Sequence, residues 1–214
     1  DVQFHWQNQD YGNYEDFLAS LTQQKRKKMR QDSRKVYEQG LSFEHKQGQD
    51  ISEQNLDYFY QCYANTYQER GQRPYLNRDF FARLHAQLPE SLVLILAQQD
   101  GQDVACALSL RDGHTLYGRY WGCTRYVPGL HFETCYNQAI QFCIAQQLRF
   151  FEGGAQGEHK LSRGLLPTPT SSAHWIADPR FAHAIEEFLH EEAGHVARYQ
   201  EALSSHTPFK TLAG

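Results

Sequence analysis

The sequence lacks any apolar run long enough to cross a membrane. Its longest, LVLILA at 92–97, has the length of a strand, whereas a spanning helix needs about 20 apolar residues. No signal-peptide pattern follows the first residue, and that residue is Asp rather than Met, so we expect a cytoplasmic protein and a piece of a longer chain. With 40% hydrophobic and 21% charged residues, the composition is typical of a folded, water-soluble domain.

Paired cysteines are also missing. The five cysteines are odd in number and form no C-x-x-C pair, which argues against a disulfide framework and against zinc. A stretch near the end, HEEAGH, is similar to the zinc-protease pattern H-E-x-x-H but places His190 and His195 five residues apart, on different sides of a helix. We therefore expect reduced thiols and no metal.

One segment concentrates positive charge on a chain whose net charge is −4. Residues 25–35, KRKKMRQDSRK, hold seven basic residues and one acid. At about 100° per residue four of them share one helical stripe. Such a stripe predicts an anionic partner, either tRNA, an anionic lipid or a phosphorylated precursor, although a solvated helix face is the alternative. The stripe consists of Arg26, Lys27, Arg30 and Arg34.

Apolar spacing of three and four residues predicts helices over 14–38, 53–69, 77–87, 131–147 and 180–203. Ser52 and Asn77 are the candidate N-terminal caps of the second and third of these helices. The fourth, here called the central helix, should bury one face, formed by Phe132, Cys135, Tyr136, Ala139, Ile140 and Cys143. The last should likewise bury Phe181, Ile185, Phe188, Leu189, Val196, Tyr199 and Leu203.

Alternation predicts strands over 41–46, 91–98, 103–111 and 114–122, the last three joined by Asp-Gly turns typical of hairpins. Further strands are expected at 148–154 and 172–177. We expect one domain, 1–214, with an N-terminal arm (1–13, including a short strand at FHW), a basic amphipathic helix (14–40) and a core (41–210). The order predicts a mixed α/β (α+β) fold. Its mostly antiparallel sheet gains a parallel pair only after the central helix, and the strands separate there to form a pocket.

Four segments together resemble the FemAB-like group of the GNAT acyltransferase superfamily, over about 4–210: FLASLTQQKRKKMRQDSRKVYEQGL, GRYWGC, LHFETCYNQAIQFCI and FEGGAQGEHKLSRGLLPTPTSSAHWIADPRF. The resemblance implies a GNAT-like fold and transfer of an acyl or aminoacyl group to an amine. The donor would be acyl-CoA or aminoacyl-tRNA, and the acceptor a small-molecule or peptide amine, such as a cell-wall precursor. No further cofactor is required. Members of the group are longer than this chain.

The loop before the central helix departs from the GNAT pattern. GNAT enzymes place a glycine-rich loop there, whose N–H groups hold the pyrophosphate of CoA. This chain has TRYVPGLHFE, in which only Gly129 stands in a comparable place and Pro128 removes one donor. Glu133 would also repel a phosphate. These residues count against acyl-CoA as the donor.

The polar loop after the strand at 148–154 is the main candidate site. A buried strand that ends in a polar turn is a common place for a ligand site in α/β proteins. Glu152 could accept the proton that an attacking amine loses, and basic side chains could bind a phosphate or carboxylate. The alternative is a structural turn with solvated charges. The binding candidates in this loop are Gly153, Gly154, Gln156, Glu158, His159, Lys160 and Arg163.

The strand at 114–122 faces this loop across the expected pocket. Alternation predicts that Arg119 and Trp121 point to one face of the strand and Tyr120 to the other. Arg119 and Trp121 are candidate binding residues, and Tyr120 is a further catalytic candidate. His131 lies at the start of the central helix and is either a base or a helix cap. The predicted function is therefore an N-acyltransferase or aminoacyltransferase; the alternative is a non-catalytic ligand- or peptidoglycan-binding module with the same fold. The oligomeric state stays open.

Overall fold

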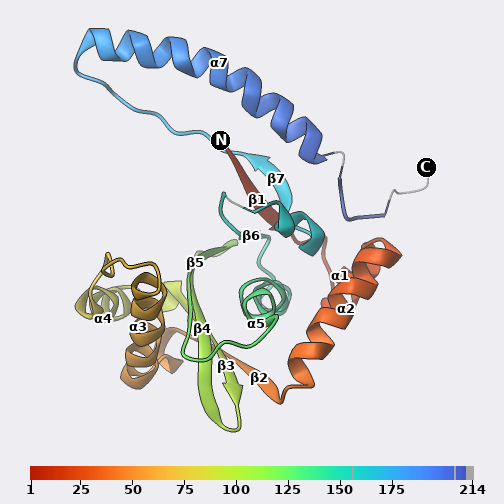
Figure 1. Cartoon of the computed structure of the whole chain (residues 1–214). Helices are drawn as coiled ribbons and strands as arrows, with labels where there is room; N and C mark the ends of the chain where they lie inside the picture. Colours follow the sequence, from red (N-terminus) through yellow and green to blue (C-terminus); the bar gives the residue numbers. More distant parts are fainter. Residues whose placement is uncertain (156, 205, 211–214) are drawn as a thin grey trace.

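A computed structural model of the chain describes residues 1–155, 157–204 and 206–210. Its centre is a seven-stranded sheet in the order β2-β3-β4-β5-β6-β1-β7 (Figure 1). The strands are β1 (Val2–Gln7), β2 (Leu41–Gln47), β3 (Leu92–Gln99), β4 (Gln102–Arg111), β5 (Thr115–Cys123), β6 (Phe150–Glu152) and β7 (Leu166–Pro169). Every pairing is antiparallel except that of β5 with β6. The predicted mixed, mostly antiparallel sheet is thus confirmed.

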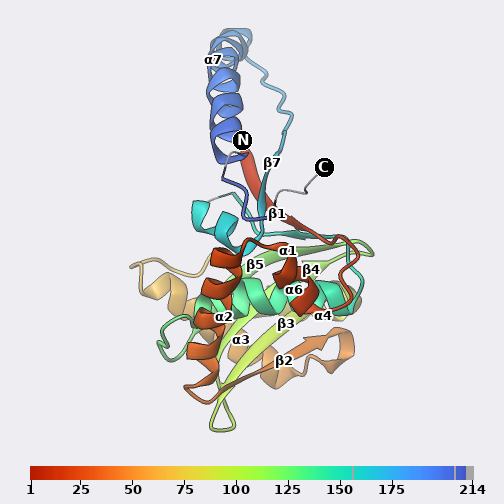
Figure 2. The same cartoon turned by 90° about the vertical axis from the view of Figure 1, so that its right-hand side faces the viewer.

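Helices cover both faces of the sheet (Figures 1 and 2). On one side α3 (Glu53–Gln68) and α4 (Arg78–Gln87) pack on β3 and β4 through an aromatic core that includes Phe59, Tyr63 and Phe81. Ser52 and Asn77 cap these two helices as the sequence predicts. α3 lies so close to β5 that a Cβ added at Gly122 would stand 2.2 Å from the carbonyl oxygen of Cys62.

The central helix lies on the other side and is continuous but not uniform. It consists of α5 (Leu130–Phe132), a π-helical turn (Glu133–Asn137) and α6 (Gln138–Ala145). Ala139, Ile140 and Cys143 are buried against the sheet, as predicted. A π-helical turn adds a residue to one turn and is often found at functional sites. Here it brings Glu133 and Asn137 inside the protein.

The N-terminal part of the chain differs from the prediction in two ways. Residues 1–13 are not a loose arm, because β1 pairs with both β6 and β7 and buries Val2, Phe4 and Trp6. The helix predicted over 14–38 is two helices, α1 (Tyr14–Ser20) and α2 (Gln23–Tyr37). It breaks at Leu21, which is buried in extended backbone and bridges to Phe209. A distant segment thus overrides the local helical pattern.

The C-terminal part also departs from expectation. No strand forms at 172–177; the seventh strand is β7, which carries two prolines and lies at the sheet edge, where proline is tolerated. α7 (Pro179–Ser204) has the predicted length but stands away from the body (Figure 1). Only its end packs on the core, through Leu203 and the half-buried Val196. No helix in the described residues is long and apolar enough to cross a membrane. All five cysteines are free.

Candidate functional site

The strand pair that changes direction is short. β5 and β6 pair over three positions, from Thr115 with Phe150 to Tyr117 with Glu152, and β5 then continues beside β4 only. β6 ends there, and all of its three residues are paired with β5. The cavities beside the polar loop, however, lie on the α2 side of the central helix and not between that helix and the sheet. The expected place of the pocket is therefore wrong.

Glu152 is half-buried at the end of β6. Phe151 faces the core under the central helix, so alternation points Glu152 to the opposite face of the sheet. Its nearest cross-strand neighbour on β1 is His5, whose pKa is lowered by burial although the charge of Glu152 opposes that shift. The structure thus does not bring Glu152 together with His131.

The two glycines after Glu152 hold the loop onto β1. The N–H of Gly153 donates to the carbonyl of Phe4 at 2.9 Å, and the N–H of Phe4 donates to the carbonyl of Gly154 at 3.0 Å. A Cβ at Gly153 would stand 2.4 Å from a methyl carbon of Leu165, and Gly154 has a φ of 81°. Their observed contacts are structural.

The loop continues into a short 3-10 helix, η4 (Glu158–Arg163), which turns two basic side chains inward. Lys160 is buried, donates from Nζ to the carbonyl of Gly154 at 3.2 Å, and has its pKa lowered by burial. Arg163 is 8% exposed and lies over the ring of Phe132 at 4.7 Å. Glu158 is exposed and accepts a hydrogen bond from Tyr199 of α7 at 3.2 Å. Gln156 lies outside the described residues.

Two histidines and three aromatic rings form what we call the histidine cluster: Trp121, His131, Phe132, Tyr136 and His159. The ring of His131 lies 5.3 Å from that of Trp121, and Tyr136 Oη lies 3.4 Å from His159 Nε2. Both histidines keep an exposed edge.

The charge of both imidazoles is set by their surroundings. Burial against the rings lowers the pKa of His131 to about 4, helped by the charge of His159 when that ring is protonated and by the charges of Lys160 and Arg163. Burial and the same two basic side chains lower the pKa of His159. At neutral pH both rings are therefore uncharged and can accept a proton.

The candidates on β5 do not share one site. A β-bulge sets Gly118 and Tyr120 opposite Ser109 and Leu108, leaving Arg119 as the extra residue. Arg119 is exposed over the ring of Tyr117, Tyr120 packs in the aromatic core under α3, and Trp121 faces His131. The prediction that Arg119 and Trp121 share a face is wrong because the bulge shifts the alternation. Tyr120 lies on the far face of the sheet from the histidine cluster.

The loop before the central helix lacks free N–H groups at two of the positions that could face a phosphate. Gly129 adopts a φ of 83° and starts the helix, and the N–H of Leu130 is already bonded to the carbonyl of Val127 at 3.2 Å. Pro128 has no N–H to offer.

On the other side of the central helix lies a cavity of about 650 Å³, which we call the α2 groove. Its polar centre is Glu133, which is 1% exposed and accepts hydrogen bonds from Ser33 Oγ, Asn137 Nδ2 at 2.6 Å and Gln138 Nε2 at 2.9 Å. Sequence reasoning considered Glu133 only as a repeller of phosphate. The signal that it missed is an acid and an amide four residues apart on an otherwise apolar helix. The groove is lined by Lys28, Asp32, Lys35, Gln39, Pro128, Gly129, Phe132, Glu133, Asn137 and Arg163.

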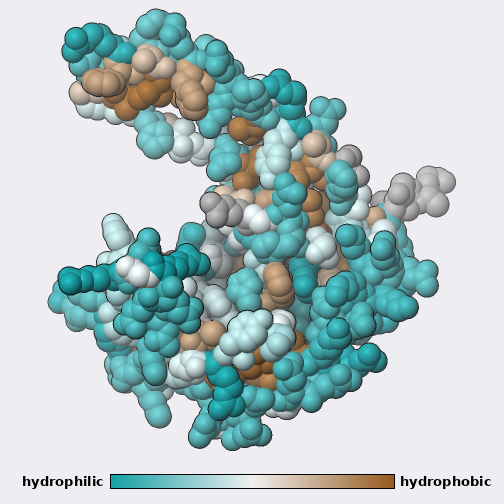
Figure 3. All heavy atoms as spheres, viewed as in Figure 1, coloured by the Kyte–Doolittle hydropathy of each residue, from teal (hydrophilic) through white to brown (hydrophobic). Residues whose placement is uncertain are grey.

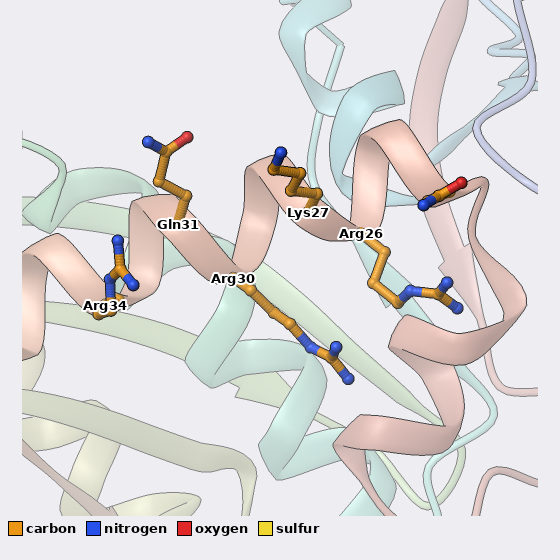
Figure 4. Close-up of a pocket in the computed structure, with 6 residues that line it drawn as sticks. Arg26, Lys27, Arg30, Gln31 and Arg34 are labelled. Atoms are coloured by element: carbon orange, nitrogen blue, oxygen red, sulfur yellow. The ribbon is translucent and has the colours of Figure 1, made fainter.

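The basic stripe does share one surface, as predicted. Arg26, Lys27, Arg30 and Arg34 line a shallow pocket of about 450 Å³ on the outer side of α2 (Figure 4). Two of the four also bind α1: Arg30 pairs with Glu15, and Arg26 Nη1 donates to the carbonyl of Ala19 at 3.5 Å. The lysines of the same segment face elsewhere, and Lys28 and Lys35 line the α2 groove.

Among the described residues no group of three or more His, Cys, Asp and Glu side chains could hold a metal ion. His183 and Glu187 form an exposed pair at 3.5 Å on α7. His190, on the same helix, does not join this pair in a metal site.

The fold is shared with solved structures of low sequence identity. The crystal structure of FemX superposes with a TM-score of 0.55 at 12% identity, covering 72% of this chain and 53% of that one. The C-terminal domain of a protein described as a lysylphosphatidylglycerol synthetase, from Agrobacterium fabrum, gives 0.52 at 12%, covering 76% and 50%. A conserved protein of unknown function from Bacteroides thetaiotaomicron gives 0.53 at 16%, covering 77% and 55%. The chain spans about half the length of these structures.

The profile of the FemAB-like family, described as peptidoglycan biosynthesis/recognition, matches residues 1–211. The chain belongs to that family, which confirms the resemblance in its sequence. No curated protein matches it.

Proposed function

We propose that this chain is the N-acyltransferase or aminoacyltransferase part of a protein that modifies an amine on a cell-wall precursor. The observation that carries the proposal is the histidine cluster, in which two uncharged imidazoles with exposed edges lie beside the buried cations Lys160 and Arg163. The family description and the fold shared with FemX support the cell-wall context and the class of reaction.

In this proposal the acceptor amine attacks the carbonyl carbon of the donor directly. The new N–C bond forms as the ester or thioester bond breaks, and His131 or His159 takes the amine proton and returns it to the leaving group. The nearby cations stabilise the negative charge that develops on the carbonyl oxygen. They also disfavour a protonated imidazole, which keeps the ring uncharged at neutral pH but makes it a weaker base.

We further propose aminoacyl-tRNA as the donor. The lack of free N–H groups at Pro128 and Leu130 disfavours acyl-CoA, and the stripe on α2 offers Arg26, Lys27, Arg30 and Arg34 to an RNA backbone. The exposed ion pairs of the stripe are individually weak, so phosphates can replace their carboxylates. The loop at Pro128 and Gly129 also favours an alternative function, a binding module that has the same fold but no site for a donor.

A transfer assay with radiolabelled aminoacyl-tRNA or acyl-CoA donors and a panel of amine acceptors tests the proposal. We expect transfer from the charged tRNA, and a loss of about 100-fold in kcat for the double variant His131→Gln/His159→Gln, since a general base contributes roughly that much. The matched control is His114→Gln, an exposed histidine in the hairpin between β4 and β5. Unchanged activity of the double variant would remove the histidine cluster from the mechanism. Amine binding without transfer from any donor would establish the binding module.

A further inference from the structure

The α2 groove contains polar atoms that lack partners. In the described part of the chain, Nη1 of Arg163 and Oδ1 of Asn137 are buried without any hydrogen-bond partner. Both residues line the groove and are at least nine-tenths buried, with exposures of 8% and 1%. Leaving such a group unpaired costs about 1–3 kcal/mol, and more for a charged one. One of the two atoms is a donor and the other an acceptor, so a ligand that satisfied both would need groups of both kinds.

The acceptor side is a buried carboxyl group that makes no ion pair. Glu133 takes part in none of the ion pairs among the described residues. A carboxylate offers about four lone-pair sites, and this one accepts hydrogen bonds from Ser33, Tyr37, Asn137 and Gln138. Buried carboxylates are normally paired with an opposite charge. The unpartnered oxygen of Asn137, beside this carboxyl group, matches an ammonium group, which has only donors.

The donor side is built for an anion. The Cζ atom of Arg163 lies 4.7 Å from the centre of the Phe132 ring, which restricts the guanidinium, and Nη2 makes only a long contact of 3.4 Å with Asp32. Asp32 is already held by Lys28 at 2.8 Å. A restricted guanidinium with a free edge binds a carboxylate through two parallel hydrogen bonds. Lys28 and Lys35 add positive charge along the α2 side of the groove.

We propose that the α2 groove binds a ligand that carries both a primary amine and a carboxylate, such as an amino acid or a peptide terminus. The amine is held by Glu133 and Asn137, and the carboxylate by Arg163. Phe132 and Pro128 provide an apolar wall for the carbon chain between the two groups. The groove shares Phe132 and Arg163 with the surroundings of the histidine cluster but opens towards α2, because Glu133 contacts Ser33 of α2 whereas His131 contacts Trp121 of the sheet. It does not depend on the transfer reaction.

Isothermal titration calorimetry of the unmodified chain with a homologous series tests this inference. The probes are the ω-amino acids from 3-aminopropanoate to 6-aminohexanoate, with hexanoate and hexylamine as ligands that carry one of the two groups. We expect one chain length to bind at least about 10-fold more tightly than either single-group ligand, because hydrogen bonds to charged groups are worth that much or more. This comparison needs no variant, so a failure to fold cannot obscure it.

Two variants then place the ligand. Arg163→Met keeps the packing on Phe132 but removes the charge, so the best ω-amino acid should bind no better than hexylamine. Glu133→Gln keeps the size of the side chain, and the same probe should bind no better than hexanoate. Arg83→Met, at an exposed arginine of α4 that pairs only with Asp79, is the matched control and should leave the series unchanged. Circular dichroism confirms that each variant is folded.

Three results overturn the inference: no member of the series binds, the single-group ligands bind as tightly as every ω-amino acid, or both groove variants keep the preference. The unpartnered atoms would then be hydrogen-bonded to internal water. These outcomes are separate from the fate of the proposed function, since the titration contains no donor and leaves the histidine cluster intact.

Discussion

The sequence predicts both the central helix and α7 as amphipathic helices, yet they differ in how much of the apolar face is buried. In the central helix Ile140 is fully buried, and even the polar side chains of Glu133 and Asn137 are inside. In α7 the apolar face is largely exposed, with Phe181 at 65% and Phe188 at 61%. Figure 3 shows this apolar side of α7 facing the hollow between the helix and the rest of the molecule. A periodic pattern therefore predicts which residues share a face, but not what covers that face.

The largest expected effect comes from the same substitution made in each helix. Ile140→Ala should lower the free energy of unfolding by about 2–5 kcal/mol, because it leaves a cavity in a close-packed core. Ile185→Ala, at a position that is 41% exposed, should change it by no more than about 0.5 kcal/mol. Urea unfolding followed by circular dichroism measures both. Equal losses would show that α7 is buried in solution and would end the comparison.

A smaller effect is expected from removing an acid from each helix. Glu133→Ala leaves the donors of Ser33, Asn137 and Gln138 without their acceptor and should cost about 1–3 kcal/mol. Glu187→Ala removes only an exposed pair with His183, which is worth less than about 1 kcal/mol. The same unfolding measurement applies. A neutral Glu133→Ala would mean that water replaces the carboxylate, and that the groove is wetter than its burial indicates.

The smallest effect is a pH dependence at the start of the central helix, because the exposed edge of His131 leaves its ring partly hydrated. The folded pKa of His131, about 4, lies below its ordinary value of 6.5, so the unfolded chain binds the proton more strongly. The stabilisation is complete above pH 6.5 and is lost as the pH falls from 6.5 towards 4. His131→Gln should therefore show a shallower decline in unfolding free energy over this range than the unsubstituted chain. Parallel curves would show that the imidazole is as well hydrated in the folded state as in the unfolded one.

The candidate site shows the same division between local pattern and long-range contact. The sequence predicted that the loop after β6 would be polar, and it selected His131, His159, Lys160 and Arg163. It could not place Glu152 on the other face of the sheet, since the facing of a three-residue strand depends on its partners. It also could not foresee the bulge at Arg119, which depends on the register between β4 and β5.

Local features were determined by the sequence alone: the helix caps at Ser52 and Asn77, the Asp-Gly hairpins, the basic stripe and the order that gives one late parallel pair. These depend on backbone preferences and on side-chain periodicity over a few residues. Tertiary structure alone decided that Leu21 breaks a helix, that β1 joins the middle of the sheet, and that Glu133 and Arg163 meet at one groove. Each of these outcomes depends on a contact with a segment about a hundred or more residues away in the chain. A pattern that spans only a few residues cannot predict such a contact.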